Sequence, residues 1–422
     1  MSRILVGASQ VVTCRGPARA RHGKEMADLD VIDNGAVVIG DDGSVLDVGA
    51  DNEMRGAFPE AEVEEVEGVL FPGFVDCHTH AVFGAPRVED QERRARGVGY
   101  KEIAAAGGGI LSSVRDVRGR SPEELETLTR ARLRRLLAGG TTTVEVKSGY
   151  GLSLDAEIKQ LEVIRALQGS RPHLVATFLG AHEVPAEHRD DRDGYVELVV
   201  REMLPAVERL GLARFCDVFC EPGVFTPRQS RTVLAAALRH GLRPKVHADE
   251  LDGSGGAELA VELDAISADH LAAISPAGIL ALGKATETLA VLLPGTMMFL
   301  GRAGRAPARQ LIDAGAAVAL ATDFNPGSSP GMSLPLMSMM GVSQLGLLPA
   351  EAITAITVNG AAAVGEATRR GQLARGFAAD IALVAILDWR ELPYWYGVNL
   401  VTAVWVSGVS CHPSLNPLDS PS

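Results

Sequence analysis

The segment FPGFVDCHTH, residues 71–80, decides the fold that we expect. It is an apolar run that ends in two histidines separated by one residue. Alternate side chains of a β-strand share a face, so Asp76, His78 and His80 are expected on the same side. The segment therefore predicts a strand that brings two imidazoles together at its carboxyl end.

Seven further runs of apolar or β-branched residues follow, and amphipathic helical stretches separate them. This alternation is typical of a parallel sheet with crossover helices, and eight strands close a (β/α)8 barrel. We therefore expect an α/β fold with a TIM-like barrel. The eight runs are residues 74–80, 141–147, 174–182, 215–221, 244–250, 265–271, 289–294 and 317–323.

Two of the expected helices carry start and stop signals. Ser121-Pro-Glu-Glu124 and Thr226-Pro-Arg-Gln229 each supply an N-cap hydroxyl, a first-turn proline and a capping-box partner. Gly139 and Gly241 then provide the stops, because glycine accepts the backbone conformations that end helices. The signals predict helices between barrel strands.

The residues before the barrel are rich in short β-like runs. Residues 35–40 and 44–49 predict a hairpin, because Asp41-Asp42-Gly43 between them is a turn signal. Much later in the chain, β-like runs return at residues 380–386 and 400–407. We expect both parts to form one smaller, discontinuous β-sandwich domain.

These patterns set the expected domain boundaries. The small β-sandwich domain should cover residues 1–66 plus 367–412, and the barrel residues 67–366. Residues 413–422 are expected to be a disordered tail. Residues 409–413 offer no obvious last strand for the small sheet.

The composition excludes a disordered chain and points to a small-molecule partner. Of the 422 residues, 46% are hydrophobic and 22% are charged, which is ample material for a buried core. The formal net charge of -13 disfavours binding to nucleic acid or to an anionic membrane.

The five scattered cysteines suit reduced thiols. Since no stretch has membrane length and residues 1–12 lack a signal pattern, we expect a cytoplasmic location.

Polar residues recur at the ends of later runs, where a barrel carries its active site. The fifth run ends in His247-Ala-Asp-Glu250, the sixth in Asp269-His270 and the eighth in Ala321-Thr-Asp323. The chain has ten histidines in all, so their gathering at strand ends is informative. Three histidines and an aspartate would hold a divalent metal and leave a position open for water.

These residues lie in segments that resemble known sequences. Residues 71–80 resemble the first-strand signature of the amidohydrolase superfamily. Further segments resemble the imidazolonepropionase family, and the resemblance runs almost from end to end. They are Gly107-Gly-Gly-Ile-Leu-Ser112, Glu145-Val-Lys-Ser-Gly-Tyr-Gly151, Gly180-Ala-His182, His247-Ala-Asp-Glu250, Ser267-Ala-Asp-His270 and Thr322-Asp-Phe-Asn-Pro-Gly-Ser328.

The resemblance implies a hydrolase of histidine degradation that acts on a C–N bond in a cyclic amide. Its substrate would be 4-imidazolone-5-propanoate, which water opens to N-formimidoyl-L-glutamate. The nucleophile would be a metal-bound hydroxide, because coordination lowers the pKa of water to about 7. The resemblance also implies a homodimer and one zinc or iron ion per chain. The implied metal ligands are His78, His80, His247 and Asp323.

Three residues near the ligands suit the proton and oxyanion chemistry. His270 is expected to stabilise the oxyanion, and Glu250 to carry a proton to the leaving nitrogen, while Asp323 shares the role of base.

Arg87 matches the family's carboxylate-binding arginine and has the forked donors that a propionate needs. We expect backbone N–H groups at positions 327 and 328 to face the substrate. The other expected substrate contacts are Tyr150, His182, Glu250, Asn325, Gly327 and Ser328.

The presence of Lys147 means that other enzymes of the superfamily remain alternative interpretations of the sequence. In dinuclear relatives such as dihydroorotases and hydantoinases, a strand-end lysine is carboxylated and bridges two metals, and a cytosine deaminase-like enzyme is a further alternative. Glu145 shares a strand face with Lys147 and is expected to neutralise it, which favours a single metal. A non-enzyme alternative is a metal-containing ligand-binding barrel. The joint presence of ligands and an acid/base pair disfavours it.

Overall fold

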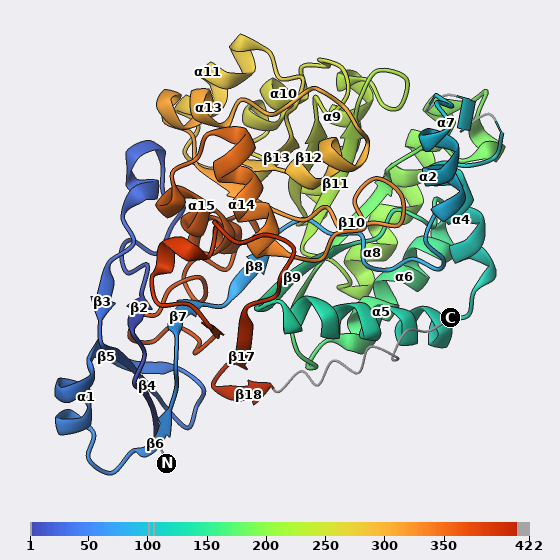
Figure 1. Cartoon of the computed structure of the whole chain (residues 1–422). Helices are drawn as coiled ribbons and strands as arrows, with labels where there is room; N and C mark the ends of the chain where they lie inside the picture. Colours follow the sequence, from blue (N-terminus) through green and yellow to red (C-terminus); the bar gives the residue numbers. More distant parts are fainter. Residues whose placement is uncertain (1, 100–101, 104–105, 412–422) are drawn as a thin grey trace.

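The computed structural model describes residues 2–99, 102–103 and 106–411 (Figure 1). Its centre is a parallel sheet of eight strands, each beside the next one along the chain. Every predicted run contributes one strand, so the predicted barrel is confirmed. The strands are β8 (Phe74–Asp76), β9 (Thr141–Lys147), β10 (His173–Ala181), β11 (Phe215–Cys220), β12 (Arg243–Ala248), β13 (Ser267–His270), β14 (Leu289–Leu292) and β15 (Val318–Leu320).

The first and last strands of the sheet approach each other just beyond their carboxyl ends. The backbone N–H of Asp323 donates to the carbonyl of His78 at 3.1 Å, and that of His80 donates to the carbonyl of Phe324 at 2.8 Å. Thr79 and Phe324 also form an isolated parallel bridge. Residues of the predicted metal group therefore bring the two edges of the sheet together.

Helices cover the outer face of the barrel sheet (Figure 1). Both predicted capping boxes are present, since the Ser121 and Thr226 hydroxyls accept the backbone N–H groups of Glu124 and Gln229. The barrel helices are α2 (Val88–Ala95), α4 (Ile110–Gly119), α5 (Pro122–Ala138), α6 (Leu154–Leu167), α7 (Arg192–Leu198), α8 (Leu204–Leu210), α9 (Pro227–Arg239), α10 (Gly256–Glu262), α11 (Pro276–Lys284), α12 (Pro294–Phe299), α13 (Ala308–Ala314), α14 (Leu334–Leu345), α15 (Pro349–Ile356) and α16 (Val358–Ala363).

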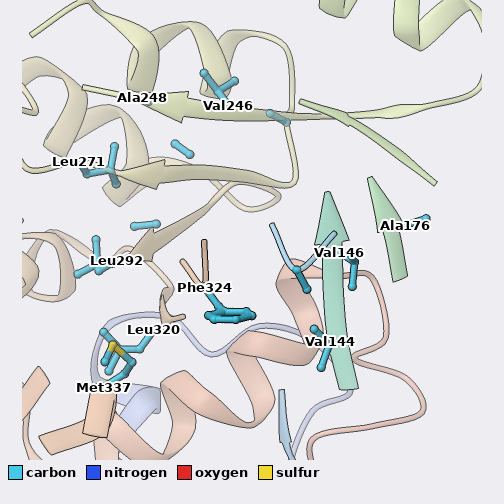
Figure 2. Close-up of a cluster of buried hydrophobic side chains, with 14 of the residues drawn as sticks. Val144, Val146, Ala176, Val246, Ala248, Leu271, Leu292, Leu320, Phe324 and Met337 are labelled. Atoms are coloured by element: carbon cyan, nitrogen blue, oxygen red, sulfur yellow. The ribbon is translucent and has the colours of Figure 1, made fainter. Parts of the chain in front are cut away.

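The main hydrophobic core lies between the sheet and these helices. Val144 and Val146 of β9 belong to the same buried cluster as Leu133 of α5 (Figure 2). Strand side chains alternate, so Glu145 and Lys147 point the other way, into the barrel. The barrel interior thus receives charged side chains that solvent does not reach.

The remaining strands form two sheets outside the barrel, with a shared core that includes Leu5, Leu70, Ile381 and Trp405. The predicted hairpin is confirmed, because β4 and β5 pair antiparallel. A strand from late in the chain, β16, pairs with β7, so the sandwich is discontinuous as expected. The strands are β1 (Arg3–Val6), β2 (Gln10–Val12), β3 (Val31–Asp33), β4 (Gly35–Ile39), β5 (Val45–Ala50), β6 (Glu62–Glu65), β7 (Val69–Pro72), β16 (Ile381–Val384), β17 (Val401–Val406) and β18 (Val409–Cys411).

The expectation that the small sheet lacks a last strand was wrong. β18 pairs antiparallel with β17, with Val406 opposite Val409. Ser407 and Gly408 between them have φ values of 47° and 72°, the backbone of a two-residue hairpin turn. The Ser-Gly pair is a weaker turn signal than Asn-Gly, so the sequence pattern did not reveal the hairpin.

The other described elements are short. They are α1 (Asp51–Ala57), η1 (Gly23–Ala27), η2 (Ala186–His188), η3 (Val199–Met203) and η4 (Trp389–Glu391). Within the described ranges, no helix combines the length and the apolar character needed to cross a bilayer. The predicted tail at residues 413–422 lies outside the described residues.

Candidate active site

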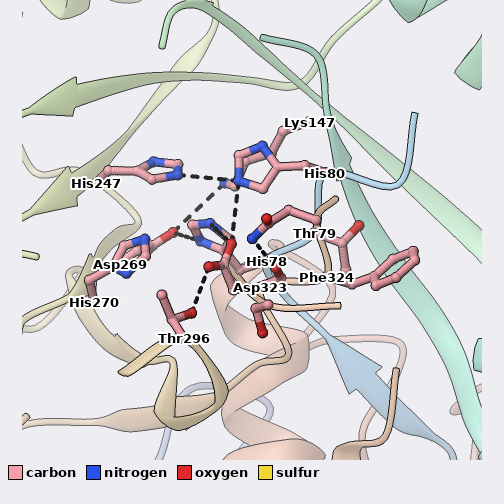
Figure 3. A network of polar contacts seen from close by, with 12 residues as sticks. His78, Thr79, His80, Lys147, His247, Asp269, His270, Thr296, Asp323 and Phe324 are labelled. Atoms are coloured by element: carbon pink, nitrogen blue, oxygen red, sulfur yellow. Dashed lines mark hydrogen bonds and ion pairs between the residues drawn. The ribbon is translucent and has the colours of Figure 1, made fainter. Parts of the chain in front are cut away.

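Three imidazoles meet at the carboxyl end of the barrel (Figure 3). His78 and His80 follow β8, and His247 is part of β12. Their ring centroids are 4.5 Å apart for His78 and His247, 5.3 Å for His78 and His80, and 5.4 Å for His80 and His247. Asp323 joins them from the end of β15, and all four side chains are buried.

Asp76 does not join this group. Its carboxylate accepts hydrogen bonds from the backbone N–H of Thr322 at 3.1 Å and from the Thr322 hydroxyl at 2.6 Å. β8 ends at Asp76, so the alternation expected from the sequence does not extend to the two histidines that follow. Asp76 instead ties the first strand to the segment after the last one.

The donor atoms have the spacing of a metal site. His80 Nε2 lies 3.4 Å from His247 Nε2, and Asp323 Oδ1 lies 3.5 Å from His80 Nε2 and 3.6 Å from His78 Nε2. Tetrahedral donors about 2.1 Å from one ion would be about 3.4 Å apart. Each predicted ligand belongs to at least one of three overlapping groups with metal-binding potential, which also take in His182 and His270.

Burial keeps two of the candidate ligand imidazoles, His78 and His80, in the form that binds metal. It lowers the pKa of His78 and of His80 well below the ordinary value, so both rings are neutral at pH 7. Among the described residues, His78 Nε2 has no hydrogen-bond partner. A buried nitrogen with a free lone pair is costly unless it has a ligand. The residues therefore fit a divalent ion.

Each of three candidate ligands is held by a second side chain. Asp269 Oδ2 lies 2.6 Å from His78 Nδ1, and Asp217 Oδ2 lies 2.9 Å from His247 Nδ1. Asp269 accepts the Nδ1–H of His78 and so directs its Nε2 to the centre. Asp217 is an ion-pair partner of the His247 ring, and it also accepts the His247 backbone N–H at 3.2 Å. The Thr296 hydroxyl donates to Asp323 Oδ2 at 2.7 Å, which leaves Oδ1 for the centre.

The sequence reasoning missed these orienting residues. Asp217 stands in the middle of the buried run FCDVFC, where a lone carboxylate needs a partner, and that signal could have identified it. Asp269 was noted only for its place beside His270. Thr296 carries no signal, since its role depends on how α12 packs against the end of β15.

Lys147 pairs with carboxylates and not with the candidate metal groups. Its Nζ lies 2.9 Å from Glu145, as predicted, and also 2.8 Å from Asp217 and 3.7 Å from Asp269. Burial alone would lower the pKa of Lys147, but the carboxylates, with Asp217 first, outweigh it and raise that pKa above its ordinary value. Lys147 is therefore a buried ammonium.

A cavity of about 290 Å³ opens above the imidazoles. Every sequence-predicted site residue except His78 lines it, and His78 lies beneath with no exposed surface. Leu300 and Arg302, which the sequence reasoning did not single out, also line it. The cavity thus brings together the predicted residues Arg87, Tyr150, His182, Glu250, His270, Asn325, Gly327 and Ser328.

Arg87 lies against the 325–328 turn at one end of this cavity. Its Nε is 3.7 Å from Asp90, and its Nε and Nη1 have no hydrogen-bond partner among the described residues. Gly327 leaves room for the guanidinium, because a Cβ there would fall 1.5 Å from Arg87 Nη2. A guanidinium with two buried nitrogens that lack hydrogen-bond partners fits a carboxylate ligand.

One expectation for this turn was wrong. The backbone N–H groups of Gly327 and Ser328 do not face the cavity as free donors, because Asn325 Oδ1 accepts both, at 2.9 Å and 2.8 Å. Asn commonly closes such a local turn with its own side chain. Asn325 and the glycine therefore shape the turn.

Glu250 and His270 stand at the ends of β12 and β13, whereas Tyr150 and His182 follow β9 and β10. Burial raises the pKa of Glu250 well above its ordinary value, and the Asp323 charge adds to this. The Glu221 carboxylate accepts the Glu250 backbone N–H at 3.2 Å and so fixes the loop after β12. Burial lowers the pKa of His270, so its ring is neutral and has one N–H to donate.

His182 and Tyr150 flank His80. The His182 ring stacks on His80 with centroids 5.0 Å apart, and Tyr150 lies 5.9 Å from His80. His182 Nδ1 donates to the carbonyl of Gly149 at 3.0 Å, because a carbonyl can only accept. Burial lowers the pKa of His182 to about 3, so Nε2 is an acceptor within the site.

The fold and the metal group define a class of protein. A sequence profile for the amidohydrolase family matches residues 69–411, so the chain belongs to this family of metal-dependent hydrolytic enzymes. Within it, the chain belongs with the imidazolonepropionases. It is 47% identical over 408 residues to the imidazolonepropionase of Geobacillus sp. (strain WCH70), covering 95% of this chain and 96% of the relative. The enzyme of Parabacteroides distasonis is 45% identical over 412 residues, covering 96% and 98%.

Solved structures share the fold at much lower identity. A triazine hydrolase variant has a TM-score of 0.71 at 18% identity and covers 97% of this chain and 94% of its own. The guanine deaminase of E. coli has a TM-score of 0.69 at 14% identity and covers 98% and 99%. These likenesses extend across both the barrel and the small sheets.

Proposed function

We propose that this chain hydrolyses 4-imidazolone-5-propanoate to N-formimidoyl-L-glutamate. One observation carries the proposal: the Arg87 guanidinium and the imidazole group line the same cavity of about 290 Å³. A substrate with a carboxylate at one end and a cyclic amide at the other would use both. The identity of 47% to an imidazolonepropionase over 95% of the chain supports this substrate.

We infer one metal ion per chain, zinc or iron, with His78, His80, His247 and Asp323 as its ligands. Nitrogen and carboxylate donors at this spacing suit either ion. When bound, such an ion acidifies water and polarises a carbonyl oxygen. Lys147 supports a single ion, because its ammonium occupies the space among the neighbouring carboxylates.

The cavity residues would divide the proton chemistry. Water adds to the ring carbonyl carbon, the C–N bond breaks, and the nitrogen must gain a proton. Glu250 has the raised pKa that an acid at neutral pH needs, and it would deliver that proton. The neutral His270 ring would donate its N–H to the developing oxyanion. Asp323 would share the role of base.

The remaining cavity residues would hold the substrate. Arg87 would bind the propionate through its forked donors. Tyr150 and His182, which flank His80, would contact the ring, together with Glu250. Asn325, Gly327 and Ser328 would complete the wall beside Arg87.

Other expectations from the sequence remain proposals. We propose domain boundaries at residues 1–66 plus 367–412 and at 67–366. A cytoplasmic location is supported by five free cysteines, four of them buried. A homodimer is supported by the family resemblance alone, and analytical ultracentrifugation of the full chain would test it.

A substrate profile tests the proposed function. The metal-loaded protein is incubated with freshly made imidazolone propionate, dihydroorotate, a hydantoin and cytosine, and loss of ultraviolet absorbance is followed for each. We expect rapid turnover of imidazolone propionate alone. Preference for another substrate would replace the proposed reaction, and no turnover of any would leave a metal-containing binding protein.

A further inference from the structure

A group of charged side chains lies inside the barrel beneath the imidazoles. Glu145 and Lys147 come from β9, Asp217 from β11, Lys245 from β12 and Asp269 from β13, and none has any exposed surface. β9 and β13 are not neighbours in the sheet, so their side chains meet across the barrel interior. Buried charges persist only when they are paired.

Lys147 contacts three carboxylates of this group, and Figure 3 marks its contact with Asp269. Its Nζ lies 2.8 Å from Asp217 Oδ2 and 3.7 Å from Asp269 Oδ2. Those same two oxygen atoms lie 2.9 Å from His247 Nδ1 and 2.6 Å from His78 Nδ1. One ammonium therefore connects, through two carboxylates, to two of the candidate ligand imidazoles.

The fixed positive charge has a physical consequence for the imidazoles. A buried carboxylate without a cation is strongly destabilised. With Lys147 between them, Asp269 is held against His78 Nδ1 and Asp217 against His247 Nδ1. Each Nε2 is then directed to the centre before any ion arrives.

We propose that Lys147 is a positioning residue that sets the affinity of the metal site, although it touches neither the ion nor the substrate. It acts through Asp217 on His247 and through Asp269 on His78. This inference rests on the proposed metal centre. Lys245 does not take its place at Asp217, because its Nζ contacts Glu145 at 3.0 Å and the carbonyls of Cys77 and Ala363 at 3.3 Å and 3.2 Å. Burial raises the pKa of Asp269, and the charge of Lys245 opposes this more than that of Lys147 does, so the path through Asp217 is expected to depend most on Lys147.

Metal affinity of full-length variants tests the proposal. Zinc dissociation constants are measured by competition with a chromophoric chelator, and circular dichroism verifies the fold. Loss of an orienting partner typically costs about 10- to 100-fold in metal affinity, so Lys147→Met is expected to weaken zinc binding by that factor. Lys147→Arg keeps the cation and should restore most of the affinity. Thr143→Val on the same strand is the matched control and should bind zinc as the wild type does.

The pathway through the aspartates is tested by Asp217→Asn and by the double variant with Lys147→Met. If Lys147 acts through Asp217, Lys147→Met should weaken zinc binding by a smaller factor in the Asp217→Asn variant than in the wild type. Should Lys147→Met fail to fold, Asp217→Asn and Asp269→Asn carry the test, and each should weaken zinc binding.

Two outcomes would overturn the inference in different ways. Unchanged zinc affinity in folded Lys147→Met, or in both Asn variants, would refute it and leave the proposed metal centre intact. A wild-type protein that binds no zinc or iron would refute the metal centre and this inference together.

Discussion

His270 Nε2 lies 3.6 Å from Glu250 Oε2 at the wall of the cavity above the imidazoles. Both side chains are buried, and neither is one of the four proposed metal ligands. The pair therefore supplies a neutral N–H donor and a carboxyl with a raised pKa beside the place where a ring carbonyl would sit.

Replacing His270 should slow the chemical step. His270→Ala removes a donor to the oxyanion, and such a loss typically lowers kcat by about 10²- to 10³-fold. KM should change little, because the donor acts mainly in the transition state. Steady-state kinetics with the metal content measured check this, with His240→Ala, a surface histidine paired to Glu208, as control. A fully active His270→Ala would remove His270 from the mechanism.

Glu250 should set the alkaline side of the pH profile. Burial raises its pKa, so the protonated carboxyl persists to a higher pH than in an exposed glutamate. As the pH rises through that raised pKa, the acid is lost and kcat should fall. Glu250→Gln cannot deliver a proton, so kcat should drop by about 10²- to 10⁴-fold and the alkaline fall should vanish. The same alkaline fall in the Gln variant would assign it to another group.

Arg87 should govern substrate affinity. Hydrogen bonds to charged groups contribute about 1.5 to 3 kcal/mol, so Arg87→Ala is expected to raise KM by roughly 10- to 100-fold with kcat nearly kept. The KM of Arg87→Lys should lie between those of the wild type and of Arg87→Ala, because an ammonium lacks the forked donors that match a carboxylate. An unchanged KM in the Ala variant would rule out a propionate at this end of the cavity.

Gly327 should matter through the space that it leaves. A Cβ at this position would lie 1.5 Å from Arg87 Nη2, so Gly327→Ala must displace the guanidinium, which is the end of a flexible side chain. We expect a higher KM with little change in melting temperature. Gly331→Ala in the same loop is the control, because the described residues leave no atom within 4 Å of a Cβ there. Equal KM values for both variants would contradict the prediction.

Metal removal should lower stability as well as activity. A ligand at about 100 times its Kd stabilises the folded state by about 2.7 kcal/mol, so added zinc should raise the melting temperature of chelator-treated protein. His247→Ala should lose this rise, and His240→Ala should keep it. An equal rise in His247→Ala would exclude His247 as a ligand.

Local patterns were enough to predict the barrel and the polar residues that stand at its strand ends. The eight runs, the capping boxes at Ser121 and Thr226, and the early hairpin depend on interactions close in sequence, and all are present. The polar residues at the strand ends were also predictable, because parallel strands deliver their carboxyl ends to one face.

The contacts between distant strands could not be predicted in this way. Lys147 meets Asp217 and Asp269 only because β9, β11 and β13 curve around a common interior. A second contact that was not predicted is local. The Asn325 side chain accepts the backbone N–H groups of Gly327 and Ser328, a turn geometry that the residue types alone do not specify.

The sequence by itself determined which residues stand at the end of each strand, because strand periodicity and helix caps are encoded within a few neighbouring residues. Only the tertiary structure decided which of those residues form ion pairs or hydrogen bonds with one another. That choice depends on distances of a few ångströms across the barrel, which arise when the sheet closes and water is excluded from its interior.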